Sequence, residues 1–81
     1  MTVTVRFFAG AAEAAGHEEE AVASGAAATV GDLRALLSAR DAELARVLGL
    51  CSVLVGGARS EDDRPLMAGD TVDVLPPFAG G

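Results

Sequence analysis

The sequence predicts an α+β domain in which one main helix packs on one face of a mixed β-sheet. Three stretches lead to this prediction: alternating apolar residues at positions 2–8 and 71–75, and an amphipathic helical pattern at positions 30–40. A strand, a helix and a later strand of the same sheet form a right-handed crossover, so we expect the first and last strands to be parallel neighbours. In this interpretation residues 1–81 form a single domain.

The first stretch, TVTVRFF at residues 2–8, alternates polar and apolar side chains and is rich in β-branched residues. Successive side chains of a strand point to opposite faces of the sheet. Val3, Val5 and Phe7 are therefore predicted to face the core, and Phe8 is predicted to face the open side.

The segment after the first strand predicts two small elements. Residues 11–15 can form one helical turn, which Gly16 closes. Residues 18–23 predict a second strand, and the three glutamates at its start suit an edge of the sheet.

The main helix is predicted at residues 30–40. Thr29 offers a hydroxyl for its N-cap, and Asp32 lies in the first turn, where the helix dipole favours a negative charge. Apolar residues recur at helical spacing, namely Val30, Leu33, Leu36 and Leu37. Asp41 is predicted to cap a further short turn that carries Leu44, Val47 and Leu48.

The last third of the chain predicts two or more strands. A β-branched run at residues 51–55 ends at Gly56-Gly57, and residues 67–70 form the turn before the final strand, TVDVL. One helix covers one face of the sheet. On the other face Phe8 and Leu75, at the carboxyl ends of two parallel strands, are predicted to meet as a protein-docking patch rather than as scattered surface residues.

Composition and charge restrict the classes of partner. The chain has 12 acidic residues and 6 arginines, no lysine, and a net charge of −6. This charge opposes binding to a phosphate backbone, so we expect no nucleic-acid partner, and it would steer the protein toward a basic rim on a protein partner. The sequence contains no apolar run long enough for a membrane span and no leader pattern, which predicts no membrane association and a cytoplasmic location.

Three features that could carry chemistry are given structural interpretations. The single cysteine, Cys51, cannot form an internal disulfide and opens an apolar strand, which is typical of a small core residue. His17 follows a glycine in a predicted loop and has no second histidine or paired cysteine, so we expect no metal site. Residues 61–63, EDD, lack the ligand spacing of a calcium loop and are predicted to be a solvated acidic turn.

The final stretch, LPPFAGG, has properties suited to a reactive arm. Pro76 and Pro77 lack backbone donors and fix φ, so the last strand is predicted to leave the sheet as a stiff extended segment. Gly80 and Gly81 lack Cβ atoms and can enter a channel as narrow as the backbone. A terminal carboxylate on Gly81 would be ionised at neutral pH and would react only after activation, for example by ATP.

Four segments together resemble the ubiquitin-like sulfur carrier family, and within it most closely the small subunits of molybdopterin synthase. They are the ending PPFAGG, the preceding PLMAGDTVDVLPP, the opening VRFFAGAAEAAG and the helix TVGDLRALL. The resemblance covers essentially the whole chain. Its most specific part is the PP-x-x-GG spacing, because related carriers for thiamine synthesis typically keep the two glycines without it. Phe78 is bulkier than the valine often found at its position.

The resemblance implies a β-grasp fold and a sulfur-carrying C-terminus. It implies that an ATP-dependent activating enzyme related to ubiquitin-activating enzymes adenylates Gly81, and that sulfur from a persulfide donor converts it to a thiocarboxylate. The tail residues that would enter the large subunit of molybdopterin synthase, where sulfur passes to a pterin precursor, are Pro76, Pro77, Phe78, Ala79 and Gly80. The chain itself would bind no cofactor and would be the non-catalytic, sulfur-donating subunit.

Other functions remain open at the level of the sequence. Carriers for thiamine or cysteine biosynthesis share the tail chemistry. A protein modifier could form isopeptide bonds through Gly81, although the absence of lysine excludes chains built on its own lysines. An interaction module with an unreactive tail is the third class.

Overall fold

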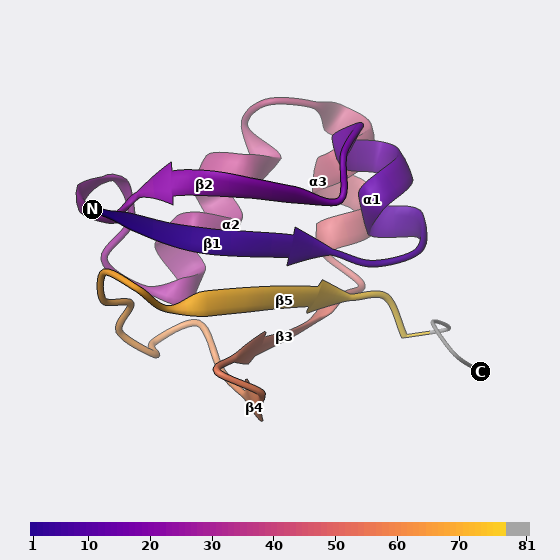
Figure 1. The fold of residues 1–81 in the computed structure, drawn as a ribbon. Coiled ribbons are helices and arrows are strands. Elements are labelled where there is room, and N and C mark those ends of the chain that lie inside the picture. The colour runs from indigo at the N-terminus through magenta and orange to yellow at the C-terminus, as the bar shows by residue number, and fades with distance from the viewer. Residues whose placement is uncertain (78–81) are drawn as a thin grey trace.

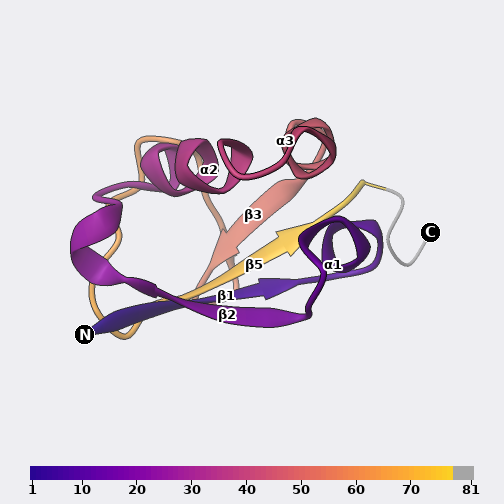
Figure 2. The same ribbon diagram turned by 90° about the horizontal axis from the view of Figure 1, so that it is seen from above.

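The computed structural model describes residues 1–77, which form a five-stranded sheet with its helices on one face (Figure 1). The strands are β1 (Thr2–Phe7), β2 (Glu19–Ala23), β3 (Ser52–Val55), β4 (Ala58–Arg59) and β5 (Thr71–Leu75). The helices are α1 (Gly10–Ala15), α2 (Val30–Ser38) and α3 (Ala42–Leu48), with a short 3₁₀ turn at Ser24–Ala26. Figure 2 shows α2 and α3 on one side of the sheet, and the other side is open.

The strand order is β2-β1-β5-β3-β4. The two strands at the centre, β1 and β5, are parallel neighbours, as the sequence predicted, and the other pairs are antiparallel. The paired residues of β1 and β5 are Thr4 with Thr71, Val5 with Val72, Arg6 with Asp73, and Phe7 with Val74. This register brings the carboxyl ends of both strands to the same end of the sheet.

The core lies between the sheet and the helices. The side chains predicted to face inward from β1 and β5 are buried, with Val5 and Val72 fully inaccessible to solvent. They pack with the apolar faces of α2 and α3, whose buried residues are Val30, Leu33, Leu37, Leu44, Val47 and Leu48. Leu36, predicted on the same helical face, is partly buried at the margin of this core.

The predicted helix starts are confirmed in atomic detail. Thr29 Oγ1 accepts a hydrogen bond of 3.1 Å from the backbone N–H of Asp32, and Asp41 Oδ1 accepts one of 2.9 Å from that of Glu43. The main helix ends at Ser38, two residues before the predicted end. The reason is a tighter final turn, in which the Arg40 N–H donates to the carbonyl of Leu37, before Asp41 adopts an extended conformation as the next N-cap.

Glycines permit the turns that reverse the chain. Gly16 closes α1 with a φ of +85°, as predicted. Gly56 and Gly57 both have positive φ and connect β3 to the two-residue strand β4 in a hairpin, where the sequence had predicted a turn without a separate strand. β2 lies at one edge of the sheet, as its glutamates suggested, and β4 lies at the other.

Among residues 1–77, no helix is long and apolar enough to cross a lipid bilayer.

Candidate functional site

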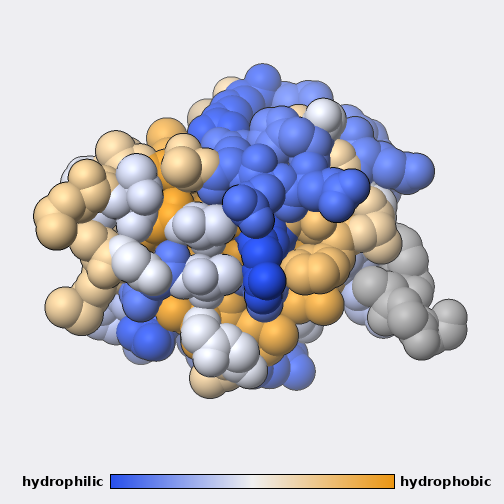
Figure 3. All heavy atoms as spheres, in the orientation of Figure 1, coloured by the Kyte–Doolittle hydropathy of each residue, from blue (hydrophilic) through white to orange (hydrophobic). Residues whose placement is uncertain are grey.

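The candidate docking patch lies at the carboxyl ends of β1 and β5 on the open face. Phe8 follows β1 and its N–H donates to the carbonyl of Val74 at 3.2 Å, so the parallel register continues to this residue and sets Phe8 beside Leu75. Phe8 is 37% exposed and Leu75 is partly exposed. Figure 3 shows hydrophobic atoms gathered over this end of the two strands. The predicted placement of both residues is confirmed.

The chain leaves the sheet directly beside this patch. Pro76 is buried and lines a hollow of about 390 Å³ together with residues of α1 and α3, and Pro77 is exposed. The start of the predicted arm is therefore fixed against the folded domain. The remaining residues predicted to act in the tail, Phe78, Ala79, Gly80 and Gly81, lie outside the described residues.

An ion pair lies immediately behind the patch on the same face. Arg6 Nε donates to Asp73 Oδ1 at 2.6 Å and Arg6 Nη2 donates to Asp73 Oδ2 at 2.9 Å, a bidentate arrangement between adjacent parallel strands. The Arg6 side chain is 47% exposed, and that of Asp73 is 11% exposed. The hydrogen bond and the charge of Asp73 raise the pKa of Arg6 above its ordinary value, so the guanidinium stays charged.

Arg6 also connects the ion pair to the apolar patch. Its guanidinium carbon lies 5.9 Å from the centre of the Phe8 ring, within the range of a cation–π contact. On the other side of Arg6, Glu19 of β2 is its register partner. Charged residues thus cross the open face in a row at the level of Glu19, Arg6 and Asp73. Figure 3 shows hydrophilic atoms in the middle of this face.

The Arg6–Asp73 pair was not predicted, although the sequence contains a signal for it. Arg6 precedes Phe8 by two residues and Asp73 precedes Leu75 by two, so any register that brings Phe8 beside Leu75 also brings Arg6 beside Asp73. The alternation that predicts Phe8 and Leu75 on the open face also places Arg6 and Asp73 there. Opposite charges at adjacent positions of neighbouring strands are a cross-strand pair, and they could have been recognised as such.

Cys51 is a core residue, as predicted. Its side chain is buried, and its thiol lies 3.2 Å from the carbonyl oxygen of Val47, to which it donates a hydrogen bond. Burial raises the pKa of the Cys51 thiol, and the nearby positive charge of Arg34 offsets this effect only in part. A neutral, buried thiol is a poor nucleophile, so the structure gives this residue a packing role.

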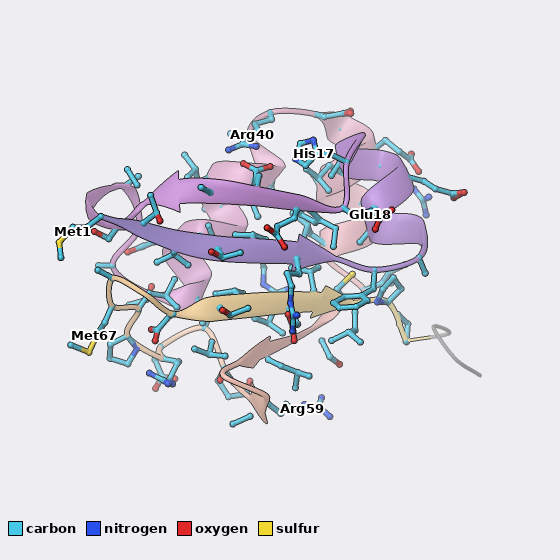
Figure 4. The ribbon with its side chains drawn as sticks, viewed as in Figure 1. Met1, His17, Glu18, Arg40, Arg59 and Met67 are labelled. Carbon is cyan, nitrogen blue, oxygen red and sulfur yellow. The ribbon has the colours of Figure 1, made fainter. Side chains whose placement is uncertain are left out.

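His17 is exposed, as expected for a loop residue, but it has partners that the sequence did not reveal. Its ring meets the edge of Phe7 at a centroid distance of 5.7 Å, and its Nε2 lies 2.7 Å from Glu20 Oε1. Arg40 donates to the same carboxylate from the end of α2. Figure 4 shows His17 and Arg40 close together beyond the β2 edge of the sheet.

These partners favour the ionised form of Glu20. Burial by itself opposes ionisation, but the hydrogen bonds from His17 and Arg40 and their charges outweigh it and lower the pKa of Glu20 below its usual value. The cluster joins the edge strand to the end of the main helix.

The acidic turn at residues 61–63 is exposed, as predicted. Asp62 accepts a hydrogen bond of 3.3 Å from Arg34 of α2, which ties the turn to the helix. Within residues 1–77, no three histidine, cysteine or acidic side chains gather as a group that could hold a metal ion.

The sheet is mixed, carries its helices on one face and has a parallel pair at its centre, and the chain leaves it beside an apolar patch. These features define a ubiquitin-like protein of the β-grasp class. The comparison with family models then gives the family: residues 5–81 match the ThiS family model, and the chain belongs to the ThiS family.

Solved structures support the fold over the full chain. The crystal structure of the small archaeal modifier protein 1 of Haloferax volcanii is 30% identical, with a TM-score of 0.82 and complete coverage of both chains. A Pyrococcus furiosus protein described as molybdopterin converting factor subunit 1 is 27% identical, with a TM-score of 0.84 over 96% of this chain and 99% of that one.

A third similar structure is a chain in the complex of subunits 1 and 2 of the molybdopterin-converting factor of Helicobacter pylori. It is 30% identical, with a TM-score of 0.73 and complete coverage of both chains. No curated protein sequence matches the chain.

Proposed function

We propose that the protein is the sulfur-carrying small subunit of a molybdopterin synthase, and that Gly81 bears the sulfur as a C-terminal thiocarboxylate. The observation that carries the proposal is the chain exit. β5 ends at Leu75, beside Phe8, and Pro76 packs against the domain at the start of the segment PPFAGG. The similarity to molybdopterin-converting factor structures supports this pathway.

The proposed reaction depends on the terminal carboxylate and on the two glycines of the tail. The Gly81 carboxylate attacks the α-phosphate of ATP on an activating enzyme, pyrophosphate leaves, and the resulting acyl adenylate is the electrophile that the free carboxylate is not. The terminal sulfur of a persulfide donor then attacks the acyl carbon and AMP leaves, which gives an acyl disulfide between Gly81 and the donor. A second thiol attacks the donor sulfur of that bond, so the Gly81 thiocarboxylate leaves and a disulfide forms on the donor side. Gly80 and Gly81 allow the backbone to enter a narrow channel in both partners, because neither has a side chain to exclude it.

Docking and reaction are performed by different parts of the molecule. Phe8 and Leu75 supply an apolar contact for the synthase large subunit, and the arm after Pro77 reaches the reaction centre. Four residues of extended chain span at most about 14 Å, so the reacting carboxylate stays within that distance of the exit. The large-subunit assignment draws on the Helicobacter pylori complex, in which subunits 1 and 2 of the converting factor are bound to one another.

A second function has its own support. The similarity to small archaeal modifier protein 1 is as extensive as that to the converting-factor subunits, and it favours a protein modifier that forms an amide bond through the same carboxylate. The two functions share adenylation of Gly81 and differ in the nucleophile that accepts the acyl group.

Intact-mass spectrometry of the protein purified from its native cell separates these functions. A sulfur carrier shows sulfur in place of one terminal oxygen, and a modifier appears in covalent conjugates with other proteins. The same spectrum establishes whether Gly81 carries the free carboxylate. A protein that shows neither species, in cells that are making molybdopterin, contradicts both proposals.

A variant with one residue added after Gly81 tests the position of the carboxylate. We expect the fold and much of the partner binding to remain and sulfur transfer to be lost, because one residue displaces the carboxylate by about 3.3 to 3.6 Å, more than an aligned reaction tolerates. Gly80→Val should act in the same way by obstructing the channel, and an extension placed before Met1 is the matched control. Dithiolene formation by the extended protein without prior trimming would overturn the proposal.

A further inference from the structure

We propose that Arg6, held in place by Asp73, selects the docking partner by requiring a carboxylate opposite its outward edge. The inference rests on the proposed function, because the partner in question is the protein that covers Phe8 and Leu75.

The geometry of the ion pair leaves one edge of the guanidinium unused. A guanidinium has five N–H donors, and carboxylates can bind along the Nε–Nη2 edge or along the Nη1–Nη2 edge. Asp73 occupies the first edge, through Nε at 2.6 Å and Nη2 at 2.9 Å. Within residues 1–77, the Arg6 side chain donates no hydrogen bond other than these two. The second edge is therefore available to a second carboxylate.

Arg6 is the exposed member of the pair. The Arg6 side chain is 47% exposed, whereas Asp73 is nearly covered, so a partner approaching the open face meets donors before it meets the acceptor. Asp73 also fixes the guanidinium in one orientation. Arg6 thus needs little further ordering when a partner binds, and this lowers the entropic cost of the contact.

Arg6 is close enough to the apolar patch that docking must cover it. Its guanidinium carbon lies 5.9 Å from the Phe8 ring centre, and its register partner Asp73 is two residues from Leu75 on the same strand. A partner that buries Phe8 and Leu75 therefore removes water from the Nη1 edge. Donors left without acceptors in an interface reduce affinity, and those of a charged group reduce it most.

A carboxylate is the acceptor that fits this edge. Two parallel N–H donors match the two oxygens of a carboxylate, whereas a single carbonyl satisfies one of them. The surrounding charge adds discrimination. Because the chain carries a net charge of −6, most acidic surfaces are repelled, and a partner must offer one acidic side chain at the position of Arg6 within an otherwise basic or neutral rim.

The test compares the wild-type protein with Arg6→Leu/Asp73→Leu for binding to the purified molybdopterin synthase large subunit of the same organism. This double substitution removes one positive and one negative charge, so the net charge is unchanged. Arg6→Leu alone would leave the charge of Asp73 nearly buried and without a partner, and the double substitution avoids this. Arg59→Leu on β4 is the matched control, because Figure 4 shows Arg59 at the far edge of the sheet.

We expect the double variant to unfold at nearly the wild-type temperature and to bind the large subunit at least about tenfold more weakly, which is the effect of losing one charged hydrogen-bonded contact. Arg6→Lys, which keeps the charge without the fork, should also bind more weakly. Arg59→Leu should bind as the wild type does.

Substitution of the partner's acidic residues identifies the carboxylate. One Asp→Asn or Glu→Gln change in the large subunit should weaken wild-type binding and have no further effect on the double variant. Equal affinity of the wild type and the double variant overturns the selective role of Arg6 and leaves the proposed function intact. Absence of wild-type binding to the large subunit overturns the proposed partner and, with it, this inference.

Discussion

Phe7 and Phe8 are neighbours in the chain, and their side chains lie on opposite faces of the sheet. Phe7 is 3% exposed and belongs to the core between the sheet and the helices, whereas Phe8 is 37% exposed on the open face. The difference comes from the alternation of side chains along β1 and not from the residue type. One face of the strand is therefore available to stabilise the core, and the other is left at the surface, where we propose that it binds a partner.

The two faces differ in chemistry as well as in burial. The covered face of β1 and β5 is uniformly aliphatic or aromatic, with Val3, Val5, Phe7, Val72 and Val74 all buried. The open face carries threonines, the Arg6–Asp73 pair and, at one end, the apolar patch. Substitutions that distinguish stability from binding therefore test the division between the faces.

The largest effect on stability is expected for Phe7→Ala. Removing a buried phenylalanine ring costs about 3–5 kcal/mol, a large share of the stability of a domain of this size. Chemical denaturation followed by circular dichroism measures this loss. Phe8→Ala is the matched control and should lose less than half as much. Similar losses for the two variants would contradict the assignment of the two rings to different environments.

The largest effect on binding is expected for Phe8→Asp and Leu75→Asp. Placing a carboxylate in the centre of an apolar contact should weaken binding to the large subunit by about 2 kcal/mol or more, as for a central interface anchor, while folding is largely preserved. Isothermal titration calorimetry and thermal unfolding measure the two quantities on the same samples.

Met67→Asp is the control for this prediction. Met67 is 69% exposed, and Figure 4 shows it at the end of the sheet opposite the chain exit. The variant should bind normally. A parallel loss of thermal stability and affinity in Phe8→Asp would place its ring in the core instead of the docking patch.

The division between the faces was predictable from sequence, because alternation depends on neighbouring residues alone. It gave the inward and outward phenylalanines and the apolar faces of both strands. The parallel central pair was predictable from the right-handed crossover of strand-helix-strand units. The caps at Thr29 and Asp41 were predictable for the same reason, since a cap is recognised over three or four residues.

Contacts between distant residues were harder to predict. The Arg6–Asp73 pair depends on the register of two strands 67 positions apart, and the Glu20–Arg40 pair depends on where a helix ends relative to an edge strand. Neither is visible in a local pattern. The hairpin to β4 was missed as a strand because two residues are too few for a period to show.

A smaller effect is expected at the start of the main helix, which belongs to the covered side. Thr29→Ala removes the acceptor for the Asp32 N–H and should reduce the free energy of unfolding by about 1 kcal/mol. Thr29→Ser retains the hydroxyl and should lose much less. Both variants should bind the large subunit as the wild type does, because the cap is not part of the open face. Weaker binding by Thr29→Ala at a temperature where it is fully folded would show that recognition extends beyond that face.

The smallest effect concerns the pH dependence of the cluster at the β2 edge. The pKa of Glu20 in the folded protein is lowered from its ordinary value of 4.5, because the hydrogen bonds and charges of His17 and Arg40 outweigh the opposing effect of burial. The ionised form therefore stabilises the fold. This contribution is complete above the unfolded-state pKa and is lost as the pH falls through the lower, folded-state value.

Glu20→Gln should remove this contribution. The variant should be less stable than the wild type at neutral pH by about 0.2–1 kcal/mol, the range for exposed pairs, because the side chains of His17 and Arg40 are 45% and 44% exposed. The two stability curves, measured by urea denaturation, should converge as the pH falls below 4.5. Glu43→Gln is the control, since the Glu43–Arg46 pair is more exposed on both sides and should show a weaker dependence. The difference in the free energy of unfolding between the wild type and Glu20→Gln could instead persist unchanged to acid pH. The glutamine would then disturb packing at the sheet edge, and ionisation of Glu20 would add nothing to stability.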